Sequence, residues 1–469
     1  MSLLTGGTLD QLGLLNPASA DLLARIQADG VETVRFLFVD PHGQLHGKAL
    51  VAGAAASALK NGVTAPSSLM LKDPSGRTAF PVWTDDAGFG AGVMTGAGDM
   101  LLVPDPATYR VLPWAPDTAW VLCDVVQPDG TPIPFAPRTL LRWALDRLAG
   151  QGFGLTVGLE IEFHIFRVID TDRTHDSGGM PGAPPETAPL NHGYQLLSEQ
   201  NHANASDILD DIRKGAQGLN LPIRSVEVEF GPSQFEVTFD PAPASDHADT
   251  MVMFRTMVKT LCAARGLHAT FMCRPVVPHG AASGWHVHQS LVDLDSGANC
   301  FAGDPKMAHQ WIAGLLDHAA ESCLLTNPTV NSYRRFQPHQ LAPDRIQWGR
   351  DNRGAMLRAL LAEGDPASRV ENRAPDPSAT PHYVFAAQIL SGLSGLEQGL
   401  TPPAPVEQPY ASEAQALPAT LGDALAAFDQ SSLYPDPVRQ FLHRLKSAEW
   451  SRYLADLSQW EQREYFTRF

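Results

Sequence analysis

The stretch VGLEIEFHIF, residues 157–166, alternates in polarity like a strand, yet one of its two faces carries carboxylates. Successive side chains of a strand point to opposite faces of its sheet. One face is wholly apolar and the other is mixed, namely Leu159, Ile161, Phe163 and Ile165 against Glu160, Glu162, His164 and Phe166. From this stretch alone, the mixed face either lies in water or forms the wall of a charged site.

The composition indicates a large folded protein that acts on small molecules or binds other proteins. The 469 residues are 44% hydrophobic and 18% charged, without the bias that marks disorder. This length favours two domains, or one large catalytic domain with an appendage. The formal charge of −17 disfavours nucleic acid or an anionic membrane as a partner, because either would be repelled.

The cysteines and the N-terminus favour a cytoplasmic protein. The five cysteines are scattered and form no CxxC pair, so we expect buried thiols in a reducing compartment. No basic segment precedes the first apolar residues, and no stretch is long enough to cross a bilayer.

The proline-rich segment QPDGTPIPFAP separates two predicted domains, residues 15–125 and residues 135–469. In the first, a strand over residues 31–40, a DPHG turn, a returning strand and a helix ending at Gly62 are expected. Neither GxxxxGK[ST] nor a strand-linked GxGxxG occurs, which excludes P-loop and Rossmann nucleotide sites.

The second domain mixes helices and strands without a strict βαβ alternation. A helix that ends at Gly150 opens it. Further helices are predicted over 204–219 and 248–266, and strands over 225–240, 269–277 and 284–293.

Acidic and histidine side chains of this domain occur where strands could bring them together. They are Glu160 and Glu162, then Glu227, Glu229 and Glu236 around a tight GPSQ turn, then His286 and His288 in GWHVHQS, and Glu371 in RVENR. Several carboxylates in apolar strands would repel one another unless a cation lay between them. Oxygen-rich ligand sets suit Mg²⁺ or Mn²⁺, and a histidine favours Mn²⁺.

Arginines are concentrated in the segment that follows. They are Arg334, Arg335, Arg345, Arg350, Arg353, Arg358, Arg369 and Arg373. In an acidic chain such a cluster is expected to hold carboxylate or phosphate groups, the alternative being a set of surface salt bridges. Divalent metals beside arginines indicate phosphoryl transfer.

Five segments occur in the order typical of the glutamine synthetase family, which the chain resembles over nearly its whole length. They are GLEIEF, EFGPSQFE, SGWHVHQSL, NPTVNSYRRFQP and RVENRAPDPSATPHYVFAAQILSG. The resemblance implies an α+β fold with a small β-grasp-like N-terminal domain and a catalytic domain built on a curved antiparallel sheet. It also implies a homo-oligomer, commonly a dodecamer, whose active sites lie between subunits.

The resemblance also assigns roles motif by motif. One metal would be held by Glu162, Glu229 and Glu236, and a second by Glu160, His286 and Glu371. ATP contacts fall on His288, Ser290, Arg353, Arg358 and Arg369, and glutamate contacts on Glu162, Gly284, His286, Arg335 and Arg373. The residues nearest the chemistry would be Arg353, Glu371 and Arg373. With ATP and two or more Mg²⁺ or Mn²⁺ ions per site, glutamate would become γ-glutamyl phosphate, and a nitrogen nucleophile would displace the phosphate.

The sequence departs from the family where ammonium is bound and deprotonated by two carboxylates. Ala65 or Pro66 occupies one of those positions and Leu341 the other, and Ala281 and Ala282 replace an Asn-Gly pair. Glutamine synthesis is therefore expected to be poor. The RRFQP segment and the WG and NR pairs after it resemble the glutamate–amine ligase branch, which includes γ-glutamylputrescine synthetase and γ-glutamylanilide synthetase.

An apolar or aromatic amine is the favoured substrate, because an aromatic amine is already neutral and nucleophilic. Candidate lining is Leu69, Met70, Phe89, Leu341 and Trp348, while Asp73, Asp85, Asp86 and Asp344 could serve a polyamine tail. The alternatives are a polyamine or alkylamine ligase, a glutamine synthetase proper, and a non-catalytic structural or regulatory ring. The last is disfavoured because every inferred metal ligand is present.

Overall fold

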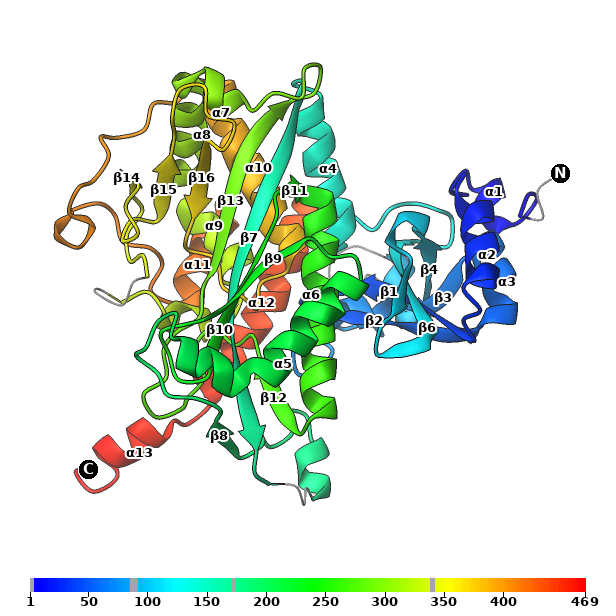
Figure 1. Cartoon of the computed structure of the whole chain (residues 1–469), viewed down its shortest axis with the longest axis horizontal. Helices are drawn as coiled ribbons and strands as arrows, with labels where there is room; N and C mark the ends of the chain where they lie inside the picture. Colours follow the sequence, from blue (N-terminus) through cyan, green and yellow to red (C-terminus); the bar gives the residue numbers. More distant parts are fainter. Residues whose placement is uncertain (1–3, 85–91, 171–173, 338–341) are drawn as a thin grey trace.

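The computed structural model describes residues 4–84, 92–170, 174–337 and 342–469. Its N-terminal part is a small mixed sheet in which β1 runs parallel to β6 and antiparallel to β2. The strand order is β2 (Leu45–Val51), β1 (Thr33–Val39), β6 (Ala115–Val126), β4 (Asp99–Pro104) and β3 (Val63–Pro66), with β5 (Arg110–Leu112) beside β6. Helices α1 (Thr8–Gln11), α2 (Ser19–Ala28) and α3 (Ala55–Asn61) complete this lobe (Figure 1).

The DPHG turn predicted from the sequence joins β1 to β2, and its hydrogen bonds and glycine conformation favour a hairpin. The Asp40 carboxylate accepts the backbone N–H groups of His42 and Gln44, and Gly43 has φ 71°, a left-handed conformation that suits glycine. Gly62 likewise ends α3 with φ 76°.

The larger part is built on a curved sheet that is antiparallel apart from its β14–β15 edge. The order is β14 (Trp348–Arg350), β15 (Leu357–Leu360), β16 (Arg369–Asn372), β13 (Trp285–Asp293), β7 (Phe153–Val168), β10 (Gln234–Phe239) and β9 (Ile223–Val228). Short strands β8 (Thr187–Pro189), β11 (Ala242–Pro243) and β12 (Leu267–Thr270) also pair with β7. The expected α+β class and the curved antiparallel sheet are therefore confirmed.

Helices cover one face of this sheet (Figure 1). The covering helices include α4 (Pro137–Ala149), α6 (Ala244–Ala264) and α10 (Pro381–Gln398). The other α-helices of this part are α5 (Glu199–Gly218), α7 (Cys300–Gly303), α8 (Pro305–Asp317), α9 (Ala319–Thr326), α11 (Leu421–Asp429), α12 (Asp436–Ala455) and α13 (Gln459–Tyr465). The apolar face of β7 packs there: Leu159, Ile161, Phe163 and Ile165 are at most 1% exposed. Phe163 meets Phe254 of α6 at 6.0 Å between ring centroids. The carboxylate face of β7 is thus the one turned away from these helices.

The strand predicted over residues 269–277 is wrong for most of its length. Strand β12 ends at Thr270, and residues 271–284 run without regular structure to the start of β13. Pro275 within the predicted strand and Pro278 just beyond it lack the backbone N–H that a sheet ladder requires, so the strand cannot continue through them.

In the described part of the chain, the five cysteines are free thiols, and no helix is long and apolar enough to span a bilayer.

Candidate active site

The register of the large sheet sets the predicted ligands directly opposite one another. Glu160 of β7 lies opposite His286 of β13, and Glu162 lies opposite Glu236 of β10. On the next strand, Glu371 lies opposite His288. Directly opposed residues of an antiparallel pair point to the same face of the sheet. Four strands therefore present these side chains on the single face of the sheet opposite α6.

Two overlapping groups on this face have the geometry of cation sites. Potential ligand atoms of Glu160, His286 and Glu371 all lie within 4.8 Å of one another, and so do those of Glu162, Glu236 and His286. The predicted second-metal set is thus brought together. Of the predicted first-metal set, Glu162 and Glu236 meet, while Glu229 lies outside the 4.8 Å group.

The electrostatics of the face fit a bound divalent cation. Burial, and then the negative charge of Glu229, raise the pKa of Glu162 to about 8. Burial and the neighbouring carboxylates raise the pKa of Glu236 further still. Buried carboxylates that repel one another in this way are stabilised by a cation between them. By contrast, the pKa of Glu160 lies well below its usual range, because His286 and His288 outweigh the opposing effect of burial.

Gln234, which the sequence did not single out, and the predicted glutamate-binding residue Gly284 hold Glu162 in place. The Gln234 side-chain amide and the Gly284 backbone N–H both donate to its Oε2, at 3.0 and 2.9 Å. Gln234 also donates to the carbonyl of Ala282 and to Ser283 Oγ, so one amide ties β10 to the loop before β13. The glutamine within GPSQ was the available signal, since a buried amide needs several partners.

Arginines fix Glu371 from both sides. Its carboxylate is fully buried and accepts from Arg358 Nη1 at 3.0 Å and from Arg373 Nη1. Arg358 also donates to Asp351 at 2.6 Å, so its guanidinium is engaged by this chain's own carboxylates. Such charge-assisted bonds orient a ligating carboxylate.

Arg335 is buried against the backbone that follows Glu371. Its Nη1 donates to the carbonyls of Arg373 and Ala374 at 2.8 and 3.2 Å. A Cβ at Gly284 would lie 2.3 Å from its Nη2, so any larger residue at this position would displace the Arg335 guanidinium. A contact between Arg335 and glutamate stays a prediction.

The residues predicted to contact ATP lie toward the β16 edge of the same sheet. Arg369 Nε donates to His288 Nδ1 at 3.2 Å, and Ser290 follows on the same face of β13. Arg353 is exposed. Arg369 and Trp348 line a hollow of about 570 Å³, so the structure places Trp348 beside a predicted nucleotide residue and not beside Ala65 or Pro66.

The predicted amine-pocket residues do not meet the carboxylate face within one chain. Ala65 and Pro66 lie in β3, in the small lobe to the right of the large sheet in Figure 1. Leu341, the third of them, lies outside the described residues, as does Phe89. Met70, another candidate for the lining, is fully buried in the core.

Sequence comparison identifies the family of the chain. The family described as glutamine synthetase, catalytic domain, matches residues 134–465. The chain belongs to the glutamine synthetase family. The resemblance drawn from its motifs is confirmed, and the protein is a ligase of this family.

Relatives of this glutamine synthetase family member span nearly its whole length. A gamma-glutamylanilide synthase from Acinetobacter sp is 37% identical, with 96% of this chain and 95% of the relative covered. A gamma-glutamylethanolamide synthetase from Streptomyces coelicolor is 32% identical, with the same coverage. The solved structure of a GmaS/ADP complex superposes with a TM-score of 0.81 at 28% identity, covering 95% of this chain and 99% of that one.

An exposed aromatic pair beside Glu229 was not anticipated from the sequence. Tyr194 and Phe230 are 53% and 41% exposed, and their rings meet edge to face at 5.0 Å between centroids. The Phe230 backbone N–H donates to Glu229 Oε2 at 2.8 Å, and the Tyr194 hydroxyl donates to the carbonyl of His279. Exposed aromatic residues at the edge of a polar site suit an apolar ligand.

Divalent metal is expected to bind this family member more tightly as the pH rises from about 6 to about 8. A cation needs ionised ligands, but the raised pKa of Glu162 and Glu236 keeps protons on the metal-free site at pH 7. Each proton released gives up to about a tenfold gain in affinity per pH unit. Titration calorimetry with Mg²⁺ in buffers of different ionisation enthalpy counts these protons.

The raised pKa values of Glu162 and Glu236 make the metal-free protein less stable as the pH rises from about 4.5 to about 8. The carboxyl pKa values are higher in the folded chain than in the unfolded one, so the folded state binds more protons over this window. Added Mg²⁺ should raise the melting temperature most at the upper end of this pH range. Metal affinity that did not change with pH, with no proton released, would contradict this account.

Proposed function

We propose that the protein uses ATP to join the γ-carboxylate of glutamate to an amine. ATP, glutamate and the amine give ADP, phosphate and a γ-glutamylamide through γ-glutamyl phosphate. The observation that carries this proposal is the convergence of Glu160, His286 and Glu371 beside Glu162 and Glu236 on one sheet face. The full-length relative named gamma-glutamylanilide synthase supports the same reaction.

The residues of the face divide between the substrates. One divalent ion would be held by Glu162 and Glu236 together with Glu229, and another by Glu160, His286 and Glu371. These ions would neutralise the charge of the phosphates and of the glutamate carboxylate. His288, Ser290, Arg353, Arg358 and Arg369 hold the nucleotide, with Arg353 at its terminal phosphate. Arg335, Arg373 and the Gly284 backbone hold glutamate. These groups position and orient the reactants for in-line transfer.

The amine is apolar or aromatic, and the aromatic pair Tyr194–Phe230 supports this choice. Next to the pair lies a hollow of about 580 Å³ with apolar walls from Phe166, Pro232 and Val277. The absence of a carboxylate at Ala65 and Pro66 supports a neutral amine over ammonium. The relative named gamma-glutamylethanolamide synthetase favours the second candidate, an alkylamine or polyamine.

A panel of amines tests the function directly. With glutamate, ATP and Mg²⁺ or Mn²⁺, we expect aniline to give a kcat/KM for phosphate release at least about a hundredfold above that of ammonium, because ammonium must first be bound and deprotonated. Isopropylamine, ethanolamine and putrescine serve as the alkylamine and polyamine arms. Full turnover with ammonium alone would make the protein a glutamine synthetase, and no turnover with any amine would favour the non-catalytic ring.

Replacing Phe230 by alanine is expected to raise the KM for aniline about tenfold or more. Burying a phenyl ring is worth about 1.5–3 kcal/mol, and that contact would be lost. The KM for glutamate should stay near its original value. Phe466, which is 74% exposed beside α13, provides the matched control Phe466→Ala. An equal change in KM for both substrates would argue against an amine contact.

We also place the protein in the cytoplasm as a homo-oligomer, a dodecamer, with no role for nucleic acid or membranes. The position of Ala65 and Pro66 in the small lobe supports active sites shared between subunits. In such an assembly β3 of one chain would close the carboxylate face of its neighbour.

A further inference from the structure

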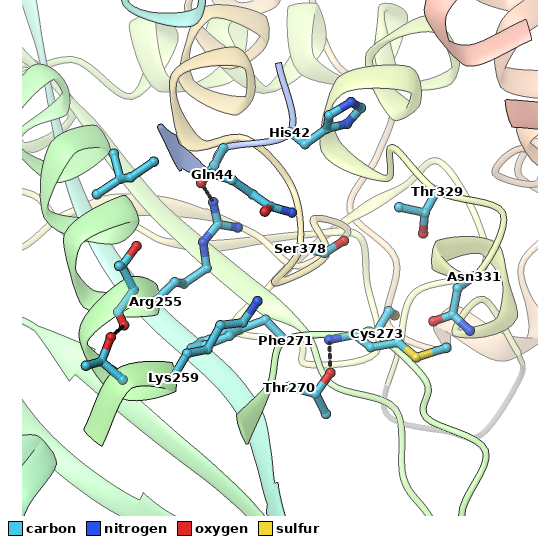
Figure 2. Close-up of a pocket in the computed structure, with 15 residues that line it drawn as sticks. His42, Gln44, Arg255, Lys259, Thr270, Phe271, Cys273, Thr329, Asn331 and Ser378 are labelled. Atoms are coloured by element: carbon cyan, nitrogen blue, oxygen red, sulfur yellow. Dashed lines mark hydrogen bonds between the residues drawn. The ribbon is translucent and has the colours of Figure 1, made fainter. Parts of the chain in front are cut away.

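A cavity of about 480 Å³ lies between the two sheets, on the helical side of the large one (Figure 2). One wall is the turn of the β1–β2 hairpin, residues 42–45. The other is α6 with the segment 270–273. Because α6 covers the apolar face of β7, this cavity is separate from the carboxylate face that forms the candidate active site.

The cavity is lined by two cationic side chains and by no acidic one. Arg255 and Lys259 line it, together with His42, whose pKa burial lowers, whereas no aspartate or glutamate does so among the described residues. The Arg255 guanidinium donates to the carbonyls of Gly43 and Ala379, so it joins the hairpin to the start of α10. A guanidinium that meets only neutral carbonyls keeps its full charge within the structure.

Lys259 is a solvent-exposed lysine that lines the cavity and pairs with no carboxylate of the described residues. In the described part of the chain it has neither a hydrogen bond nor an ion pair. Desolvation of its ammonium group, and then repulsion by Arg255, lower the pKa of Lys259, and no carboxylate acts to raise it. The carboxylates that act on Arg255 are those of Asp376 and Asp40, which do not line the cavity. They are hydrogen-bonded elsewhere, to Ser378 and His46 respectively.

A second donor faces Lys259 from the hairpin. Figure 2 shows the side chains of Gln44 and Lys259 directed into the cavity from its two walls. The Gln44 amide makes no hydrogen bond with any residue in the described ranges, although its backbone N–H is bound by Asp40. We propose that this cavity binds a small dianion, a phosphate group or a dicarboxylate, between Lys259 of α6 and Gln44 of the hairpin turn.

The chemistry of the cavity suits such a ligand. An ammonium group and an amide N–H are donors for phosphate or carboxylate oxygens. The volume is that of an ordinary small-molecule site and holds either anion with its bridging waters. Because one wall is the hairpin turn of the small sheet and the other is helix α6 of the larger part, the bound anion holds the hairpin against α6.

Titration calorimetry of the full-length, Mg²⁺-bound protein with inorganic phosphate, and separately with succinate, tests this proposal. We expect Lys259→Gln to bind one anion fewer per chain than the original protein, or to bind it at least about tenfold more weakly, since a charge-assisted contact is lost. The matched control is Lys214→Gln, in an exposed lysine of α5 that pairs with Asp210. Phosphate bound at the carboxylate face is common to all these proteins and cancels in the comparison.

Gln44→Ala keeps the proposal testable if Lys259→Gln folds poorly, because it alters only the exposed hairpin turn. Gln44→Ala should weaken the same anion-binding event that Lys259→Gln weakens. Loss with phosphate alone assigns a phosphate ligand, and loss with succinate alone assigns a dicarboxylate. Identical isotherms for both variants, the control and the original protein would overturn the proposal.

Discussion

Replacing Glu371 by glutamine is expected to lower the rate of phosphate release at least about a thousandfold, a loss of about 4 kcal/mol of transition-state stabilisation. Glu371 is fully buried and belongs to the cation group with Glu160 and His286. A neutral amide is a poor ligand for a hard divalent cation. The change also removes the carboxylate that Arg373 contacts and leaves Arg358 with Asp351 alone.

A steady-state assay with saturating glutamate, ATP and amine measures the loss. The matched control is Glu397→Gln, because Glu397 is an exposed glutamate whose pair with Arg147 contributes little. Direct Mg²⁺ titration of Glu371→Gln should show at least one ion fewer per chain, a result that misfolding alone would not give if far-UV circular dichroism is unchanged. Retention of a tenth or more of the activity, with full metal binding, would show that Glu371 is not a ligand.

The carboxylate face could be predicted in part because successive side chains of a strand point to opposite faces of its sheet. The period of two in residues 157–166 already put Glu160 and Glu162 on one face and the core residues on the other. The pairing of strands could not be obtained this way, since register depends on contacts between distant segments. Only the structure shows that Glu162 lies opposite Glu236 and that His286 belongs to both cation groups.

The positions that sequence reasoning missed share one property, which is that their function depends on a neighbour far away in the chain. Tyr194 and Phe230 are unremarkable by themselves and become a pair only when the segment before α5 meets the turn after β9. The strand expected over residues 269–277 failed although it holds β-branched residues, and Pro275 within it cannot join a sheet ladder. The cluster around Arg138 was missed because its three aspartates come from three separate segments.

Replacing Arg138 by alanine is expected to lower the free energy of unfolding by about 3–5 kcal/mol, the usual cost of removing one partner from a buried ion network. Arg138, in the first turn of α4, is 12% exposed and contacts three carboxylates. Its Nη2 lies 2.6 Å from Asp105 and 2.9 Å from Asp249, and its Nη1 lies 3.0 Å from Asp124. Asp105 and Asp124 belong to the small lobe and Asp249 to α6, so the substitution also weakens the joint between the lobes.

Arg142→Ala is the matched control on the same helix. Arg142 contacts only Asp124 among these acids, at 2.6 Å, and is 54% exposed, so its removal should cost no more than about 1 kcal/mol. Urea unfolding followed by tryptophan fluorescence compares the two variants with the original protein. Equal stability of Arg138→Ala and Arg142→Ala would mean that the network contributes no more than a surface pair.

The pH dependence separates loss of charge from loss of packing in Arg138→Ala. Burial opposes ionisation of Asp249, but the charge of Arg138, together with His382, outweighs it and holds the pKa of Asp249 below its usual range. The stability that this provides is present above a pH of about 4 and is lost as the pH falls through the lowered pKa. The original protein should therefore lose part of its advantage over Arg138→Ala in acid, where Asp249 becomes protonated. A cavity left by the missing side chain would instead keep the two proteins apart by the same amount at every pH.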